Sequence, residues 1–118
     1  MIIIDSLTKP LRIELGDKEK SNHKVRIKFK KILQHLSNLK NKYNVLIIGT
    51  SQVTSILSKT TGFNIRPVAE YLLNEYIEES ILLSSNEMGK KFAYLINSCF
   101  LPESNSEFVI AGSGIKDP

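Results

Sequence analysis

Two polar residues stand close behind short apolar runs, where buried strands would end. Asp5 follows the run Ile2–Ile4, and Gln52 follows Val45–Ile48 after a Gly-Thr-Ser segment. Ligands of open α/β sheets collect at the carboxyl ends of parallel strands, so Asp5 and Gln52 would share one functional edge if the two strands are neighbours. A carboxylate there could be a ligand for a hard metal ion such as Mg²⁺. The alternatives are an Asp that only caps a strand end and a Gln that is a solvated loop amide.

A second set of residues could bind phosphate. Nine of the 16 Lys and Arg residues lie between Lys18 and Lys42, where Glu19 is the only acid, and the whole chain has a net charge of +4. A local field of this sign attracts phosphate backbones or anionic surfaces. The candidate contacts are Lys18, Lys20, Lys24 and Arg26, with Lys59 and Arg66 as weaker ones. The alternative is a merely solvated Lys-rich helix face.

Other classes of site are not indicated. The single cysteine, Cys99, excludes an internal disulfide framework, favours a reducing compartment, and is expected to be a small buried apolar residue. His23 and His35 are 12 residues apart without a nearby carboxylate pattern, so a metal or catalytic role for them is not predicted. The longest apolar run is too short to span a bilayer, and the chain opens without a secretory signal. We expect no membrane partner.

The elements that must position these residues can be predicted from periodicity. The β-branched run Ile2–Ile4 is typical of a strand buried on both faces of a parallel sheet, and Val45–Ile48 is typical of a second one. Between them, residues 21–43 have apolar side chains at alternating spacings of four and three, which predicts a long helix. Its inward face would comprise Val25, Phe29, Ile32, Leu36, Leu39 and Tyr43. The order strand, helix, strand predicts a βαβ crossover in one domain of 118 residues.

The second half of the chain is more polar. Residues 54–66 are rich in Ser, Thr and Asn, which predicts an irregular mobile loop ended by Pro67, within which Phe63 could stack on a base or pack beneath the loop. Residues 68–79 could form a helix. Strands are expected at 81–83, 91–96 and 107–111, with turns at 86–89 and 112–116, as an antiparallel meander.

The order of several motifs resembles a known family. Residues 2–8 (IIIDSLT), followed by Arg12 and Glu14, resemble the Walker B segment of RadA and its eukaryotic relatives. Residues 43–53 (YNVLIIGTSQV) resemble the next core strand, which ends in Thr-Asn-Gln-Val in that family. Residues 66–67 resemble the end of the second DNA-binding loop, and 89–91, 101–103 and 108–117 resemble the basic hairpin, the cap segment and the closing strand. The chain is thus similar throughout to RecA/RadA strand-exchange recombinases.

This resemblance implies an α/β fold that is a partial RecA-like P-loop NTPase core: parallel strands with a crossover helix, then a C-terminal antiparallel meander. It implies that Asp5 holds Mg²⁺, that Gln52 senses the γ-phosphate, and that the first DNA-binding loop lies around residues 16–24. No Gly-x₄-Gly-Lys-Ser/Thr phosphate-binding loop occurs in the sequence. We therefore expect ATP and Mg²⁺ only if a partner supplies that loop, and otherwise no cofactor.

Two departures from the family favour an accessory relative. Strand-exchange enzymes have Gly-Gly after the second loop, where this chain has Ala69-Glu70, and glycine permits backbone conformations that these residues resist. The family's Asp-Ser-Pro of the cap segment is replaced by residues 97–99 (Asn-Ser-Cys). Similar erosion is found in recombinase paralogs, which load or stabilise the main recombinase filament.

The leading hypothesis is a noncatalytic or partner-dependent recombinase paralog that binds single-stranded DNA and a recombinase or paralog protein. A second hypothesis is half of a split or truncated DNA-dependent ATPase that needs a phosphate-loop subunit in trans; a third is a truncated product without independent function. The strand Ile2–Ile4 should leave apolar surface uncovered where another half would pack. The compartment would be nuclear in a eukaryote and cytoplasmic in an archaeon.

Overall fold

The computed structural model describes residues 1–15, 19–58 and 62–118, with side chains described except at 19–21, 55–58 and 62–66. Contacts between Cα atoms divide the chain into two compact units, Met1–Tyr76 and Ile77–Pro118. The organisation as one domain remains a prediction. None of the helices in the described residues is long and apolar enough to cross a membrane.

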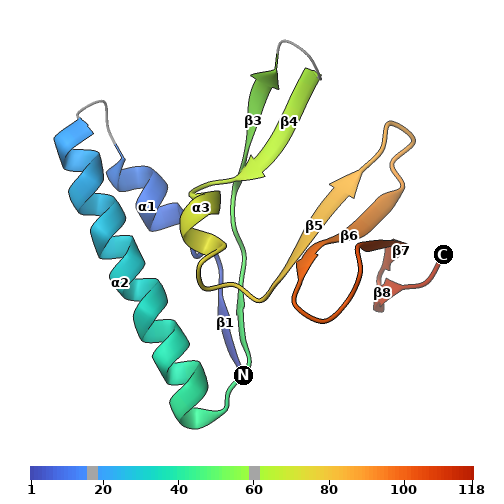
Figure 1. Ribbon diagram of the computed structural model, residues 1–118. Helices are drawn as coiled ribbons and strands as arrows, with labels where there is room; N and C mark the ends of the chain where they lie inside the picture. Colours follow the sequence, from blue (N-terminus) through green and yellow to red (C-terminus); the bar gives the residue numbers. More distant parts are fainter. Residues whose placement is uncertain (16–18, 59–61) are drawn as a thin grey trace. The chain divides into compact units, whose positions relative to one another are not determined.

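The first unit contains the predicted βαβ crossover. Strand β1 (Ile2–Ile4) pairs in parallel with β2 (Ile47–Gly49), so that Ile2 faces Ile47 and Ile4 faces Gly49. The connection runs through two helices, α1 (Lys9–Glu14) and α2 (Glu19–Tyr43), as Figure 1 shows. The expectation of neighbouring parallel strands is confirmed, and the carboxyl ends of β1 and β2 therefore lie at the same edge of the sheet.

The long helix was predicted almost to its ends, but its buried face was placed partly wrong. Among the described side chains of α2, Phe29 and Leu33 are buried, and Leu33 was not on the expected face. Ile32, by contrast, is 42% exposed. Helix α2 packs against α1, and the side chains that are covered form a stripe narrower than the full apolar face of the helix. Asn44 ends the helix with a φ of 49°, a left-handed conformation that Asn tolerates.

The short helix α1 was not predicted. Pro10 lies in its first turn, a position where the missing amide proton of Pro costs nothing, and Leu11 points into the core at 3% exposure. Six residues are too few for apolar periodicity to be recognised in a sequence. The helix matters because its N-cap residue, Thr8, and its residue Arg12 both contact Gln52, next to the end of β2.

Strand β1 is less buried than its composition predicted. Ile3 is 63% exposed and Ile48, its neighbour on β2, is 44% exposed. In the described residues β1 pairs only with β2, so the two-stranded sheet lacks the layers that would bury it on both faces. The expectation of a doubly buried strand is therefore wrong for this chain, whereas the expected uncovered apolar surface is present.

Two further predictions for the first unit are corrected. Residues 54–66 were expected to form an irregular loop, but β3 (Val53–Ser58) and β4 (Gly62–Pro67) pair as antiparallel strands. Backbone amides and carbonyls pair in such a ladder whatever the side chains are. The polar composition of this segment therefore gave no sign of the hairpin. The expected helix over 68–79 is only the single turn α3 (Glu70–Leu73), which starts from a left-handed Ala69.

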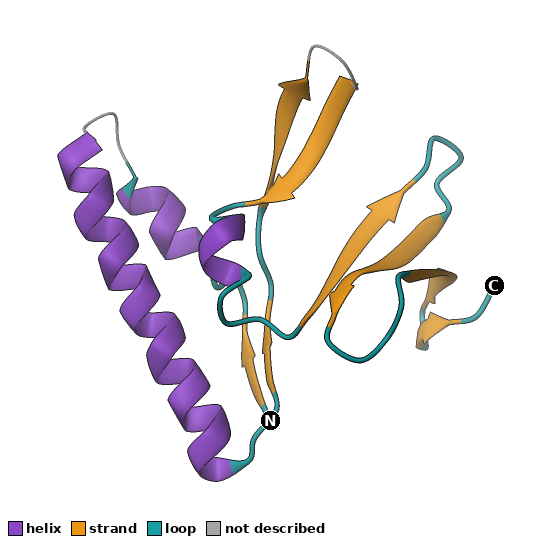
Figure 2. Cartoon of the chain, in the orientation of Figure 1, coloured by secondary structure: helices purple, strands orange, loops and turns teal. Residues whose placement is uncertain are grey.

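The second unit is the predicted antiparallel meander, whose strands are drawn in orange in Figure 2, as are the strands of the first unit. Its strands lie in the order β5 (Glu79–Ser85), β6 (Lys91–Ser98), β7 (Ser104–Ala111) and β8 (Gly114–Lys116). The predicted turn at 86–89 is confirmed, because the Asn86 side chain accepts hydrogen bonds from the amides of Met88 and Lys90. Residues 114–116 form a strand, so the turn expected at 112–116 is shorter than predicted.

Candidate functional site

The carboxyl ends of β1 and β2 bring the predicted acidic residue into direct contact with the second strand. The Thr50 hydroxyl donates a hydrogen bond of 2.6 Å to Oδ1 of Asp5, and the Thr50 amide donates to the Ile4 carbonyl at 3.0 Å. Asp5 itself is exposed, and its peptide bond to Ser6 is cis. The hydroxyl therefore holds one carboxylate oxygen in place, while a ligand can approach from solvent.

A buried hydroxyl ties the start of α1 to the end of β2. Thr8 is fully buried, and its Oγ1 accepts a hydrogen bond of 3.0 Å from the Gln52 amide. The same oxygen lies 3.3 Å from Oγ of Ser51. A buried amide that lost such a partner would carry a desolvation penalty, so this bond fixes the backbone of Gln52 relative to α1.

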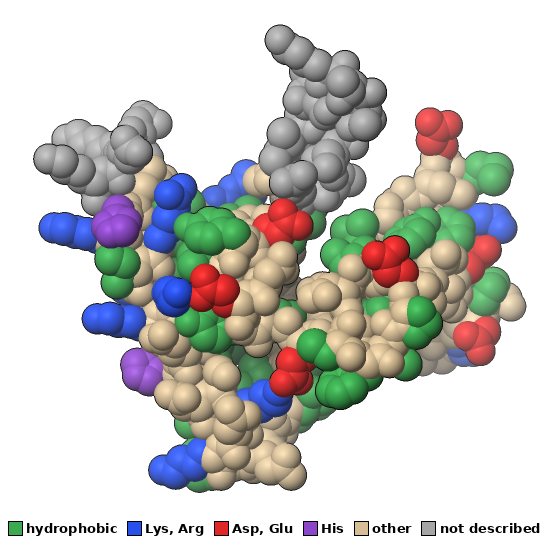
Figure 3. Space-filling model, viewed as in Figure 1, with side chains coloured by type: hydrophobic (Ala, Val, Ile, Leu, Met, Phe, Trp, Pro, Cys, Tyr) green, Lys and Arg blue, Asp and Glu red, His purple; other side chains and the backbone are tan. Residues whose placement is uncertain are grey.

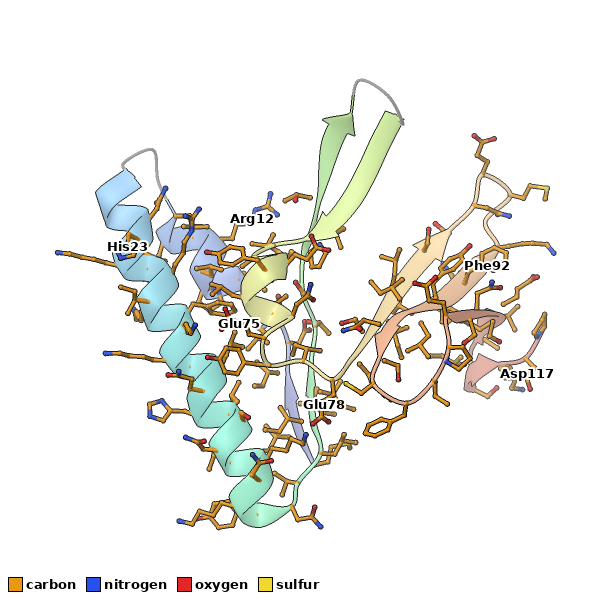
Figure 4. All side chains as sticks on the ribbon, in the orientation of Figure 1. Arg12, His23, Glu75, Glu78, Phe92 and Asp117 are labelled. Atoms are coloured by element: carbon orange, nitrogen blue, oxygen red, sulfur yellow. The ribbon has the colours of Figure 1, made fainter. Side chains whose placement is uncertain are left out.

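Gln52 is held from two further sides. Its carbonyl accepts a hydrogen bond of 2.9 Å from the Val68 amide, directly after β4. Its side-chain Oε1 accepts a longer bond of 3.3 Å from Nη1 of Arg12, which is labelled in Figure 4. The residue predicted to report on a phosphate is thus connected to Thr8 and Arg12 at the start of α1 and to the end of the hairpin β3–β4.

A concavity of about 410 Å³ lies beside Asp5. It is lined by Asp5, Ser6, Lys9, Pro10, Ile13 and Glu14. No group of three or more His, Cys, Asp or Glu side chains able to hold a metal ion occurs in the described residues. Mg²⁺ commonly takes one or two protein carboxylates plus phosphate oxygens and water, so Asp5 fits as one ligand of a nucleotide-bound ion.

The candidate phosphate contacts are only partly visible. Lys24 and Arg26 are exposed on α2. Lys20 lies on α2 and Arg66 on β4, but their side chains are outside the described residues, as is that of Phe63. Lys18 and Lys59 fall outside the described residues altogether. Asp5 and Gln52 are brought to one edge, whereas Lys24 and Arg26, the basic candidates with described side chains, lie on α2.

An ion pair fixes α2 to the segment after α3. Nζ of Lys30 lies 2.7 Å from Oε2 of Glu75, and the two side chains are 42% and 46% exposed. The hydrogen bond and the charge of Glu75 raise the pKa of Lys30 above its ordinary value of 10.5. Lys30 is therefore engaged in structure rather than available for a ligand.

The two departures from the family motif have different structural outcomes. Ala69 has φ 59° and ψ 37°, so it adopts the left-handed conformation that a glycine would favour. Around residue 98, the Ser98 hydroxyl accepts hydrogen bonds of 3.1 Å from the amides of Phe100 and Leu101 and donates one to Glu79. Cys99 is exposed, which corrects its expected burial, because it lies in this turn rather than in the core.

Thr8 and Arg12 are the site residues whose contacts the sequence did not reveal. Both lie within the segment that resembles Walker B, but the resemblance implies no role for either of them. The one local signal is the Thr8-Lys9-Pro10 sequence, a typical helix start, yet no side-chain cap bond forms and the hydroxyl is used across the sheet edge instead.

Comparison with known proteins identifies the family of the chain. The sequence model described as Rad51 matches residues 1–118. The chain is 30% identical over 119 residues to the DNA repair and recombination protein RadA of Ignicoccus hospitalis, a match that covers all of this chain and 36% of that protein. It is 29% identical to the meiotic recombination protein DLH1 of Candida albicans, over 99% of this chain and 37% of that protein. The chain spans little more than a third of the length of these relatives. With its parallel strands, crossover and meander fitting a partial RecA-like core, the chain belongs to the Rad51 family.

Proposed function

We propose that the chain acts in DNA repair by homologous recombination, as a noncatalytic or partner-dependent recombinase paralog that binds single-stranded DNA. The observation that carries this proposal is the parallel register of β1 and β2, which places Asp5 and Gln52 on one edge. Family membership and the names of the relatives support a role in recombination. The compartment would follow the source, nuclear in a eukaryote and cytoplasmic in an archaeon.

The edge supports nucleotide-dependent signalling more than independent hydrolysis. Asp5 provides one oxygen-rich ligand position, and Gln52 connects that position to the hairpin β3–β4 through the Val68 amide. A phosphate-binding loop is needed to complete a nucleotide site, and the 118 residues contain no such sequence. ATP and Mg²⁺ would therefore bind at this edge together with a partner segment that carries the loop.

Uncovered apolar surface on the small sheet supports a protein partner. Ile3 and Ile48 are neighbours on β1 and β2 and are 63% and 44% exposed. Exposure of neighbouring apolar side chains on a sheet to water is unfavourable. We therefore propose that a recombinase or paralog protein buries this surface. Replacing Ile3→Lys should weaken co-purification with such a partner, and unchanged co-purification would count against this face.

Single-stranded DNA binding is tested by fluorescence anisotropy with a labelled oligonucleotide at two salt concentrations. The matched variants are Lys24→Glu on α2 and Lys116→Glu on β8, since each reverses one exposed positive charge. Lys24→Glu should weaken binding and Lys116→Glu should leave it nearly unchanged, because phosphate contacts depend on local charge. Absence of binding even at low salt, or equal losses in both variants, would contradict the DNA role.

The second candidate function is half of a split or truncated DNA-dependent recombinase ATPase. It is favoured by the position of Asp5, which is exposed beside a concavity and already oriented by Thr50. Mixing the chain with a polypeptide that carries a phosphate-binding loop should then produce ATP hydrolysis that neither part shows alone. Asp5→Asn should abolish this activity, whereas Asp117→Asn, a matched change near the C-terminus, should not.

A further inference from the structure

A row of positive and imidazole side chains runs along the outer face of α2. Its members are Lys24, Lys28, Lys31, His35 and Lys42, and we call this set the α2 stripe. All five are exposed, and they recur at spacings of four, three, four and seven residues. At 3.6 residues per turn these positions stay within roughly 60° of one another, so they form a single line on the helix.

The α2 stripe is long, straight and concentrated in charge. From Lys24 to Lys42 it extends about 27 Å at a rise of about 1.5 Å per residue. Helix α2 contains eight Lys or Arg residues and one Glu, a net charge of +7, against +4 for the whole chain, so the remainder of the chain is negative. Residues 20–69 contain neither Asp nor Glu. Figure 3 shows blue and purple side chains projecting along this side of the helix.

The stripe is not needed to hold the fold together. From residue 22 onward, the buried residues of α2 are Phe29 and Leu33, which lie on the other side of the helix from the stripe. One member is engaged: Nζ of Lys28 lies 2.9 Å from Glu14, although Lys28 is still 64% exposed. Lys42 lies 5.1 Å over the ring of Tyr43, an exposed contact at the end of the row. Lys24, Lys31 and Lys42 thus remain accessible to an anionic ligand.

We propose that the α2 stripe binds the phosphate backbone of double-stranded nucleic acid. Single-stranded nucleic acids gain much of their binding affinity from bases that stack on aromatic side chains. Four of the five stripe residues are lysines, which cannot stack in this way. A rigid line of lysines instead matches the regular ridge of phosphates on a duplex, about 8 base pairs over 27 Å. The inference extends the proposed DNA role along α2, to a surface that the strand-end edge does not include and that shares only Lys24 with the loop lysines.

The test measures anisotropy of a labelled 30-base-pair duplex of random sequence, between about 50 and 200 mM salt. With three lysine contacts, affinity should fall about 40-fold over this range. Lys31→Gln with Lys42→Gln should reduce the fall to about 3- to 4-fold, because one contact remains. The matched control, Lys90→Gln with Lys116→Gln, also removes two exposed charges and should leave the 40-fold dependence unchanged. A stripe variant with unchanged salt dependence overturns the inference.

A variant that adds a charge gives a test that a folding defect cannot mimic, because its expected effect is a steeper salt dependence rather than a loss. His35→Lys adds a fixed charge in the middle of the row and should steepen the fall to about 150-fold. Failure of this variant to steepen the dependence, or equal binding of poly-glutamate in place of the duplex, argues for a general polyanion surface and overturns the proposal.

The outcomes separate this inference from the proposed function. If single-stranded DNA binds through Lys24 but the duplex does not bind, the stripe proposal fails and the recombination role stands. If the duplex binds with the expected stripe dependence but single-stranded DNA does not, the single-strand role fails and the stripe proposal stands.

Discussion

The two compact units use their polar side chains differently. In the first, hydrogen bonds join segments that are far apart in sequence: Asp5 with Thr50, and Thr8 and Arg12 with Gln52. In the second, they stay within one turn or between adjacent strands, as at Asn86, Ser98 and Glu107. The first unit thus builds a site from tertiary packing, and the second builds a sheet from local pairing. Mutations should therefore perturb the first unit more strongly than matched changes in the second.

The largest difference is expected for leucines. Leu33 on α2 is 2% exposed and Leu83 on β5 is 68% exposed. Leu33→Ala should lower the free energy of unfolding by about 2–5 kcal/mol through lost burial and a cavity, whereas Leu83→Ala should change it by less than about 0.5 kcal/mol. Urea denaturation of the two variants measures both values. Similar losses would mean that Leu83 is covered in solution and that the comparison is wrong.

The next effect concerns the hydroxyl that holds Gln52. Thr8→Val keeps the shape of the side chain but leaves the Gln52 amide without its 3.0 Å acceptor, which should cost about 1–3 kcal/mol. Ser106→Ala in β7 is the matched change, because that exposed hydroxyl only donates to a neighbouring carbonyl, and it should be nearly neutral. Chemical denaturation gives the stabilities. A neutral Thr8→Val would show that Thr8 does not position the edge.

Two residues with a left-handed backbone conformation provide the next test. Their variants should change the free energy of unfolding by smaller amounts and in opposite directions. Ala69 has a φ of 59° in the first unit, and Gly89 has a φ of 77° in the second, with open space where a Cβ would lie. Ala69→Gly should raise the free energy of unfolding by about 0.5–1 kcal/mol, because relief of strain exceeds the entropy that glycine adds to the unfolded chain. Gly89→Ala should lower it by a similar amount. Thermal denaturation of both variants measures the two changes, and changes of the same sign would contradict the assignment.

The smallest effect is expected for the exposed pair Lys30–Glu75. Glu75 raises the pKa of Lys30, so the stability from this pair is complete below the ordinary Lys pKa of 10.5 and disappears as pH rises through the higher folded value. Glu75→Gln should therefore lower the urea midpoint slightly at neutral pH and leave it unchanged well above pH 10.5. Glu103→Gln, an exposed carboxylate in the second unit, is the control. A difference that persists at high pH would exclude the pair as its cause.

Sequence patterns were reliable where a signal is local and repeated. The long helix, the two apolar strands and the Asn86 turn were predicted because periodicity, β-branched runs and turn residues act on their own neighbours. The position of Asp5 beside β2 followed from the parallel crossover. The hairpin β3–β4, the single-turn α3 and the exposure of Cys99 were missed, because backbone pairing, a left-handed alanine and a turn held by Ser98 leave little trace in composition. The bond of Thr8 to a residue 44 positions away could not be read from either segment alone.

The contacts around Gln52 separate its main chain from its side chain. The amide and the carbonyl are each engaged at 3.0 Å or less, whereas the side chain has one exposed bond of 3.3 Å to Arg12. Gln52 can therefore exchange rotamers on a fast timescale while its peptide plane stays still. The carboxamide and the backbone of this one residue should then show clearly different order parameters in NMR relaxation.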